Sequence, residues 1–443
     1  MNRYVLLIAV FVPLFATGLP ATVKAQYRIF FTPSLTVSEE YTDNLFLTED
    51  NKESEFITIV SPGASFAVEG KRSNLELSYN PGFTFYQEYD ELNSVRHSAS
   101  LSGNRQLSKR LSLSVADNFS RTEKPTTRGE LSLDPEASKL EGDVDYTIRT
   151  EREPRYTNDA QIRMDYGFGP DDSVYARYSH RLYREDTPGA EDSDKHNPGV
   201  GFTYWPDSWN GFRGSASYTR GLFDGESNDF HNWEGSLRYT RNLNRVWGGF
   251  LEYRHLYTDF DGDEVDYQVY NPAAGVTFTF AEEAAIELGA GYFFQDRADG
   301  ETESGPVINL DMEKTWRFKR GSFRISGGSG FEQTYFGSEN LGFTEYYGAR
   351  SALEYSLTRY LQGTASLDYR FNRYLDEDPV QEDHVASATA GLTYTLTRWL
   401  DISLEDTYSV VETNQKDLNA NDYRENSVML SVTASPQPYL LAQ

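Results

Sequence analysis

The sequence predicts an all-β fold, a transmembrane antiparallel β-barrel of the outer-membrane type with about 20 strands (18 to 22). Three observations support this class. Apolar and polar side chains alternate from Ile29 almost to the end of the chain, which is the period of a β-strand. Many alternating segments reach the length of about 9–11 residues that a tilted strand needs to cross a bilayer. Short connections also alternate with longer ones, as expected for short periplasmic turns and long outer loops.

The first 25 residues have the pattern of a secretory signal peptide. Arg3 supplies a positive charge, residues 4–17 are apolar, and Val23-Lys24-Ala25 forms a small-residue cleavage site. We therefore expect residues 26–443 to form one barrel domain in the outer membrane of a Gram-negative cell. No later apolar run approaches the roughly 20 residues of a spanning helix, and only a closed barrel leaves no unpaired strand edge in lipid.

Composition restricts the possible functions. The chain has no cysteine, which excludes disulfides and thiolate-bound metals, and its net charge of −27 argues against a nucleic-acid partner. A hydrophobic fraction of 38% with 14% aromatic residues fits either a soluble all-β protein or a membrane barrel. Composition alone therefore leaves both classes open.

The repeating unit is a hairpin, and residues 385–408 show it most clearly. Leu392, Tyr394 and Leu396 share one face, a turn follows at Thr397-Arg398, and the alternation then resumes. Similar short connections are predicted at 70–73, 108–110, 169–172, 206–208, 242–244, 281–283, 319–321, 358–359 and 397–398. Most of them are basic, whereas the longer connections are mostly acidic. The longest, 124–154, lacks alternation and is interpreted as a long loop or a plug in the lumen.

Tryptophan marks one end of the predicted barrel. Five of the six lie at or beside short turns: Trp205, Trp209, Trp247, Trp316 and Trp399. Indole rings prefer a membrane–water interface, so we interpret these five as a periplasmic aromatic girdle. The alternative is that they cap the sheet ends of a soluble sandwich.

Strand alternation also assigns a set of charged side chains to the inside of the barrel. These lumen-facing candidates are Arg177, Arg181, Glu252, Arg254, Asp368 and Arg370. The arginines could form a track for an anionic or hydroxyl-rich polymer. Alternatively, they pair with lumen carboxylates such as Glu252 and Asp368 and only stabilise a wet interior.

No catalytic, cofactor-binding or metal-binding residue is predicted, and the chain is not expected to be an enzyme. None of the six histidines has metal-ligand spacing, and Ser179 and His180 point to opposite faces of a strand. The acidic run 259–264 looks like a calcium loop, but its glycine, Gly262, is the fourth residue rather than the sixth. We therefore interpret it as a solvated outer loop.

Several short motifs carry a family resemblance. They are the run 32–47 (TPSLTVSEEYTDNLFL), Ser61-Pro62-Gly63, Tyr253-Arg254-His255, Gly291-Tyr292-Phe293 and Asn340-Leu341-Gly342-Phe343. In order and spacing the chain resembles the putative β-barrel porin type 2 family, over nearly its whole length after the signal peptide. The resemblance implies an outer-membrane component associated with exopolysaccharide loci that carry exosortase and PEP-CTERM systems. It also implies a neighbouring periplasmic polysaccharide-export protein, and no catalytic residues.

The leading hypothesis is a conduit or accessory component for exopolysaccharide export, with outer-membrane lipid, lipopolysaccharide and the exported polysaccharide as partners. A general or carbohydrate-type diffusion porin is the second hypothesis. An outer-membrane hydrolase or a purely structural barrel is the third. The C-terminus is atypical for the class, because Pro436 and Pro438 follow the last alternating strand and cannot donate ladder hydrogen bonds.

Overall fold

The structure is a computed structural model that describes residues 27–125, 152–185, 191–225, 227–281, 284–300, 302–336, 339–375, 380–414 and 422–442. The predicted signal peptide, 1–25, lies outside the described residues. So does most of the predicted loop or plug at 124–154, of which only the two ends are described.

The described chain forms one antiparallel sheet that closes on itself, so the predicted fold class is confirmed. Twenty strands make the wall, and a short strand, β21, follows them. Their bounds are β1 Arg28–Thr42, β2 Glu55–Gly70, β3 Ser73–Tyr86, β4 Ser94–Gln106, β5 Leu111–Thr122, β6 Arg155–Gly167, β7 Ser173–Glu185, β8 Ser193–Tyr204, β9 Asn210–Phe223, β10 Phe230–Asn242, β11 Trp247–Phe260, β12 Tyr267–Ala281, β13 Ala284–Arg297, β14 Thr302–Phe318, β15 Gly321–Phe336, β16 Glu339–Ser356, β17 Leu361–Tyr374, β18 Gln381–Thr397, β19 Leu400–Thr413, β20 Tyr423–Ala434 and β21 Tyr439–Ala442.

Closure joins the two ends of the chain. β1 pairs with β2 on one side and with β20 on the other, from Leu35↔Ala434 to Thr42↔Ser427. The segment with Pro436 and Pro438 leaves the ladder, and β21 then resumes pairing with β1 at Phe31. The prolines therefore interrupt the closing strand without ending its course along β1.

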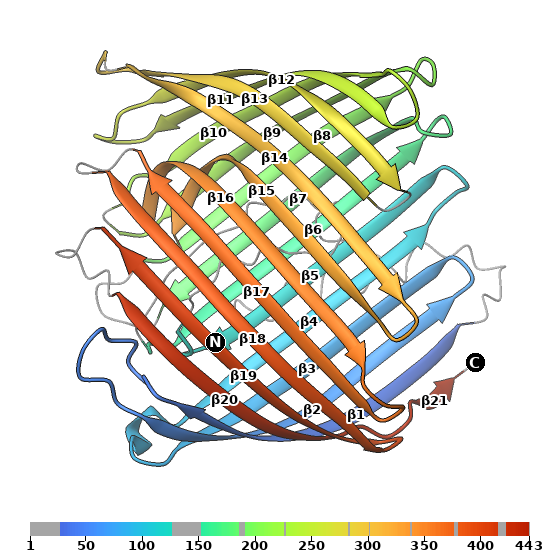
Figure 1. Ribbon diagram of the computed structural model, residues 1–443, viewed down its shortest axis with the longest axis vertical. Coiled ribbons are helices and arrows are strands. Elements are labelled where there is room, and N and C mark those ends of the chain that lie inside the picture. Colours follow the sequence, from blue (N-terminus) through green and yellow to red (C-terminus); the bar gives the residue numbers. More distant parts are fainter. Residues whose placement is uncertain are drawn as a thin grey trace.

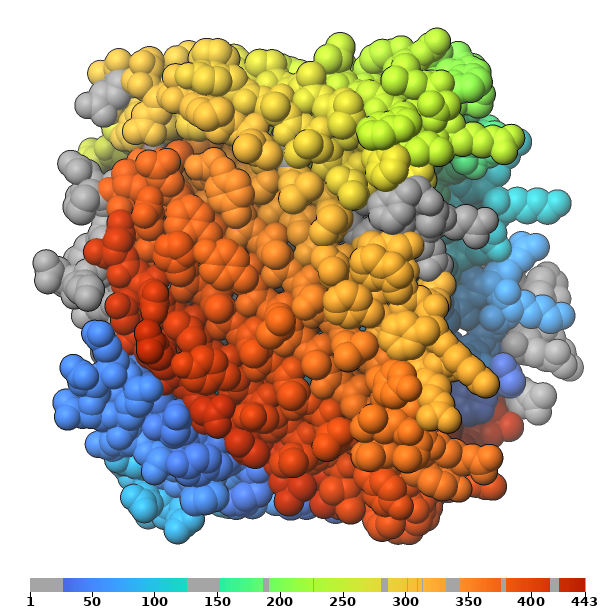
Figure 2. Space-filling model, in the orientation of Figure 1, coloured from blue at the N-terminus to red at the C-terminus, as the bar shows by residue number. Residues whose placement is uncertain are grey.

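The barrel axis runs from left to right in Figure 1, and the strands are inclined to it. Short turns gather at one end, called the turn end, and the longer connections at the other, called the loop end (Figure 1). Strands about 4.8 Å apart and tilted by about 40° give a circumference of about 125 Å, or about 40 Å between opposite backbones. On the face seen in Figure 2, side chains of the orange and red strands lie side by side over the wall.

The two faces of the wall differ as the sequence alternation predicts. Leu251, Leu367 and Leu237 are each more than half exposed on the outer face. Their neighbours Phe250 and Asp368 point inward, where Phe250 is only 7% exposed. An exposed apolar outer face with a more polar inner face is typical of a sheet that contacts lipid on one side and water on the other.

The described part of the chain contains one helical element, the 3-10 turn η1 at Asp90–Leu92. No helix within the described ranges is long and apolar enough to cross a membrane.

Candidate functional site: the barrel lumen

The inner face of the barrel is lined by charged and hydroxyl-bearing side chains, many of them joined across strands. Direct hydroxyl pairs link Ser38 to Ser431 at 2.8 Å and Ser78 to Ser100 at 2.7 Å. Five of the six lumen-facing candidates make ion pairs, hydrogen bonds or ring contacts with neighbouring inward side chains, as follows.

Arg254 pairs with Glu234 at 2.6 Å rather than with Glu252 on its own strand. Glu252 instead lies 3.7 Å from Arg238. Arg181 pairs with Asp159 on the neighbouring strand β6. These contacts match the interpretation in which the arginines stabilise the interior, but with partners that the alternation did not identify.

The candidates on β17 follow the same rule. Asp368 pairs with Arg350 of β16 at 2.9 Å. Arg370 donates to Asn372 at 2.7 Å and lies over the Tyr346 ring. The sixth candidate, Arg177, differs from the others because it forms no ion pair with the described residues, and its Nη1 is buried without a hydrogen-bond partner.

One hairpin leaves the wall near the loop end. The β14–β15 ladder stops at Asp311↔Gly328, although β14 begins nine residues earlier, at Thr302, and β15 runs on to Phe336. At this point the Ser329 hydroxyl accepts a hydrogen bond from the Leu310 amide and donates one to the Ile308 carbonyl. The side chain therefore replaces the first ladder bonds that are lost.

The free part of this hairpin, 329–336 of β15 with 339–343 of β16, is called the inner hairpin. The Phe331 carbonyl accepts a hydrogen bond from Arg254 Nη1 at 3.1 Å, and Arg254 lies over the Phe331 ring. Arg254 belongs to β11, four strands from β15, a separation of about 19 Å along the wall. Such a contact requires the inner hairpin to fold into the lumen and lie across the inner face of β11–β13.

An apolar cluster fixes the inner hairpin there. Phe343 is fully buried, and its ring lies 5.2 Å from Phe293 of β13 and 5.1 Å from Phe331. The cluster consists of Phe230, Leu256, Phe260, Tyr267, Val269, Phe293, Val307, Phe331 and Phe343. Aromatic side chains buried together contribute most of the energy of such a contact, so the inner hairpin narrows the loop end of the lumen.

A second element, the β1–β2 connection, fills part of the lumen on the opposite side of the loop end. The β1–β2 connection buries Leu45 against Ile57 and Tyr86, and Leu47 against Val385, Val411 and Tyr423. Both leucines are at most 1% exposed. An apolar loop that packs on the inner wall leaves less open space in the bore.

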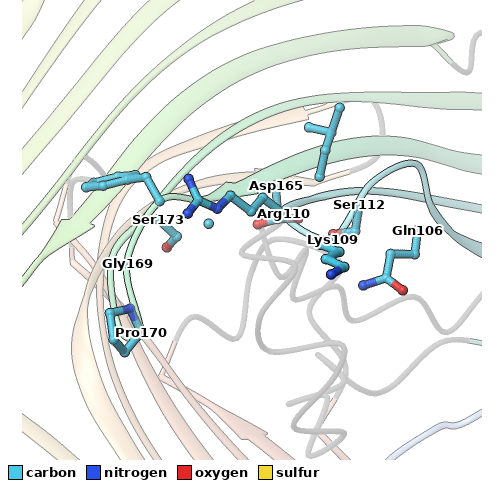
Figure 3. Close-up of a pocket in the computed structure, with 11 residues that line it drawn as sticks. Gln106, Lys109, Arg110, Ser112, Asp165, Gly169, Pro170 and Ser173 are labelled. Carbon is cyan, nitrogen blue, oxygen red and sulfur yellow. The ribbon is translucent and has the colours of Figure 1, made fainter.

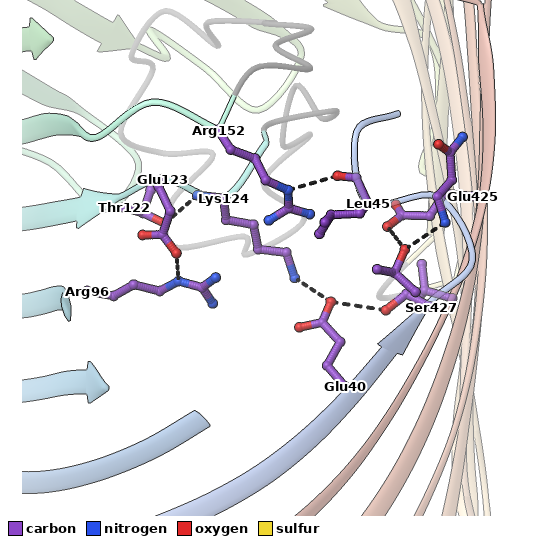
Figure 4. A network of polar contacts seen from close by, with 12 residues as sticks. Glu40, Leu45, Arg96, Thr122, Glu123, Lys124, Arg152, Glu425 and Ser427 are labelled. Atoms are coloured by element: carbon purple, nitrogen blue, oxygen red, sulfur yellow. Dashed lines mark hydrogen bonds and ion pairs between the residues drawn. The ribbon is translucent and has the colours of Figure 1, made fainter. Parts of the chain in front are cut away.

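The two described ends of the 124–154 connection join this loop (Figure 4). Lys124 Nζ lies 3.4 Å from Glu40 on β1, and Arg152 donates to the Leu45 carbonyl at 2.8 Å. β5 and β1 are about 19 Å apart along the wall, so both ends turn into the lumen. The plug predicted between them lies outside the described residues and stays a prediction.

Glu123 anchors the first of these ends. Burial alone would raise the pKa of its carboxyl, but Arg96 at 2.7 Å holds that pKa below its usual value. The ion pair therefore stabilises the lumen network at neutral pH.

At the turn end the lumen opens into a basic pocket of about 580 Å³. Lys109 and Arg110 of the β4–β5 turn line it together with Ser112 and Asp165 (Figure 3). Arg110 extends toward Ser173 at the start of β7 (Figure 3). A solute that enters from this end meets cationic side chains first.

The tryptophans fall at two levels. Four of the predicted girdle are 44–52% exposed beside the turns: Trp209, Trp247, Trp316 and Trp399. Trp205 covers Gly211 at the same end. Trp233, which the prediction left out, is 56% exposed and lies nine residues along β10 from Asn242. Nine residues of a tilted strand rise by about 23 Å, close to the height of about 25 Å of a barrel's apolar band.

Most of the histidines bond to neighbouring tyrosines or carboxylates, as in the pair of His180 Nε2 with Asp194 at 3.1 Å. Tyr hydroxyls contact the Nδ1 atoms of His97, His196 and His384 at 2.8–2.9 Å, on the exposed outer face. Within the described ranges no three His, Asp or Glu side chains gather to hold a metal. In the acidic run 259–264, Asp261 pairs with Arg220 at 2.8 Å.

One known family matches the C-terminal part of the chain. Residues 228–435 match the family model described as "Putative beta-barrel porin 2". No curated protein matches the sequence.

Solved structures resemble the fold at low sequence identity. The FrpB iron transporter from Neisseria meningitidis has a TM-score of 0.50 and 11% identity over 91% of this chain and 82% of that chain. A mutant of the ferric enterobactin receptor PfeA from Pseudomonas aeruginosa has a TM-score of 0.48 and 11% identity over 93% and 81%. OccAB4 from Acinetobacter baumannii has a TM-score of 0.40 and 11% identity over 93% and 99%. The FrpB likeness supports the barrel fold, and no function follows from any of the three.

Proposed function

We propose that this chain, whose residues 228–435 match a porin family, conducts exopolysaccharide across the outer membrane as a passive channel. The observation that carries the proposal is the closed barrel of 20 strands with a polar inner face. A bore of this width holds water and a hydrated chain unless loops close it. The match of residues 228–435 to the porin family model supports the porin character, and the resemblance described above supports the polymer as cargo.

The mechanism needs no chemical step. Hydroxyls such as Ser38 and Ser78 and paired charges such as Arg254 and Glu234 can replace part of the water around a sugar chain. Because these groups already bond to one another, none binds the polymer tightly, and the chain can slide. We propose that the protein has no enzymatic activity.

Orientation follows from the ends of the barrel. We propose that the turn end faces the periplasm and that the loops face outward among lipopolysaccharide, as short turns and long loops do in bacterial barrels. A periplasmic export protein would then dock at the basic turns. A leader at 1–25 would deliver the chain to this compartment.

Transport requires the loop end to open. The inner hairpin has no β14–β15 ladder and is held to the wall by Arg254, by the apolar cluster and by one backbone hydrogen bond from the Leu375 amide to the Phe343 carbonyl, so few backbone bonds must break for it to move. We infer that displacement of the inner hairpin opens the bore.

Deletion of the gene tests the proposal. Loss of surface polysaccharide with unchanged uptake of small solutes is the expected result. Unchanged surface polysaccharide together with impaired solute uptake would instead favour a diffusion porin. Hydrolysis of lipid or peptide by the purified protein would contradict a passive role.

A further inference from the structure

The inner face of β6–β10 carries three pairs of cationic side chains directly opposite each other on neighbouring strands. The pairs are Arg163 with Arg177, Arg181 with Lys195, and Arg213 with Arg238. Like charges in such positions destabilise a sheet. Three such cationic pairs lie on five consecutive strands, although the chain has a net charge of −27, and this arrangement needs a physical explanation.

Carboxylates compensate only part of this charge. Asp165 lies 2.9 Å from Arg163, and Glu287 lies 2.6 Å from Arg238. Arg177 and Arg213, the partners of those two arginines, form no ion pair with any residue that the structure describes. In these two pairs, one arginine therefore remains for another counterion, whereas Arg181 of the third pair is bound to Asp159.

Four of these arginines lie at one level. Arg163, Arg177 and Arg238 are each four residues from the turn end of their strands, and Arg213 is three residues from it. We call Arg163, Arg177, Arg213 and Arg238 the arginine belt. Its members lie about 10–13 Å inside the turn-end rim, since a strand rises about 3.3 Å per residue.

Strand β8 leaves room between the two halves of the belt. Its inward positions there are Gly199 and Gly201, which carry no side chain. Arg177 lies over Gly199, where a Cβ would come within 3.0 Å of Nε. Tyr175 covers Gly201 and supports Arg163, whose guanidinium lies 3.9 Å from the ring centre. The belt is thus held against the wall by packing, with Arg213 exposed to the lumen.

The belt continues a path that begins outside the barrel. The basic pocket with Lys109 and Arg110 lies at the same end, and Asp165, the partner of Arg163, lines it. An anion that enters by this pocket reaches the arginine belt next. Guanidinium groups bind planar carboxylates through two parallel hydrogen bonds.

We propose that the arginine belt is a binding site for carboxylate groups of an acidic saccharide, with Arg177 and Arg213 as the two residues that contact the ligand. This inference rests on the proposed function and narrows its cargo to polymers rich in uronic acid. Arg163 and Arg238, whose charges are paired with Asp165 and Glu287, are positioning residues that line the site beside Arg177 and Arg213.

Equilibrium binding tests the site and does not depend on whether the bore is open. Fluorescently labelled oligogalacturonate is titrated with the purified barrel in detergent, and a labelled maltooligosaccharide of equal length serves as the neutral probe. The unchanged protein should bind only the acidic probe, with an affinity that falls as salt rises. The double substitution Arg177→Gln and Arg213→Gln should weaken binding at least tenfold.

Two further variants control for folding and for net charge. Arg241→Gln removes a charge near the same rim of β10 but on the outer face, as its parity with Leu237 shows, and should bind like the unchanged protein. The Arg177→Lys and Arg213→Lys protein keeps both charges and should retain more binding than the glutamine variant. Equal affinity for both probes, or full binding by the glutamine variant, would overturn the proposal. Failure of the conduit function would appear separately, as unchanged surface polysaccharide after gene deletion.

Discussion

Truncation of Phe343 should release the inner hairpin and open the lumen. The side chain is fully buried between Phe293 and Phe331, within the apolar cluster. A buried Phe→Ala substitution costs about 3–5 kcal/mol, which changes an equilibrium by a factor of roughly 100 to 1,000 or more. Because no β14–β15 ladder holds the hairpin there, we expect most of this cost to fall on its docking rather than on the wall.

Planar-bilayer recording measures the effect. Phe343→Ala should raise the unitary conductance or the fraction of time spent open, relative to the unchanged protein. Phe294→Ala is the matched control, since that ring lies next to Phe293 on β13 but is 46% exposed on the outer face. The reasoning is refuted if Phe343→Ala lowers the unfolding temperature while conductance stays the same, because the ring would then stabilise the wall and not a movable hairpin.

Three other outcomes follow from the described contacts. The depressed pKa of Glu123 means that its pair with Arg96 stabilises the fold above the usual carboxyl pKa and stops doing so as the pH falls through the lower, folded-state pKa. Glu123→Gln should therefore unfold at a lower temperature at pH 7 and show a smaller further loss on acidification, as measured by circular dichroism. Gly201→Ala would place a Cβ 2.5 Å from the Tyr175 ring and should cost about 1–3 kcal/mol in denaturant unfolding, whereas an unchanged midpoint would contradict that packing. A variant that keeps Trp233 as its single tryptophan should be quenched more by lipids brominated near the headgroup than near the chain ends, and the reverse order would argue against an interfacial position.

Strand alternation predicted the wall because a period of two is imposed by the backbone itself. It assigned Arg254 and Asp368 to the inside, and it gave the turns that separate the strands. It did not identify their ion-pair partners, Glu234 and Arg350, which lie on neighbouring strands. The alternation within one strand does not determine its register with the next strand.

The inner hairpin could not be predicted in the same way. Nothing in its sequence separates it from the wall strands beside it, and only contacts with β11 and β13 show that it lies inside. One local feature could have indicated the bend, the run Ser-Gly-Gly-Ser-Gly at 326–330, where the ladder to β14 ends. The filling of the loop end by Leu45 and Leu47 was missed because a loop has no periodicity to read.

The arginine belt was missed for a third reason. Arg177 was assigned inward by parity, but Arg163, Arg213 and Arg238 become its neighbours only when the registers of four ladders are combined. Charge repulsion within a cross-strand pair is a property of two strands, so neither strand alone reveals it.

Because β1 pairs with β20, folding of the barrel includes one pairing between strands that lie far apart in the sequence. Thr36 and Thr433 touch at 3.0 Å across 397 residues of chain, whereas the other ladders of the wall join consecutive strands. Bringing such ends together costs about 5 kcal/mol of chain entropy, a cost that must be met before the final row of bonds can form. Before closure the chain would thus be an open, curved sheet with two unpaired edge strands. Assembly factors that protect those edges would set the rate of closure.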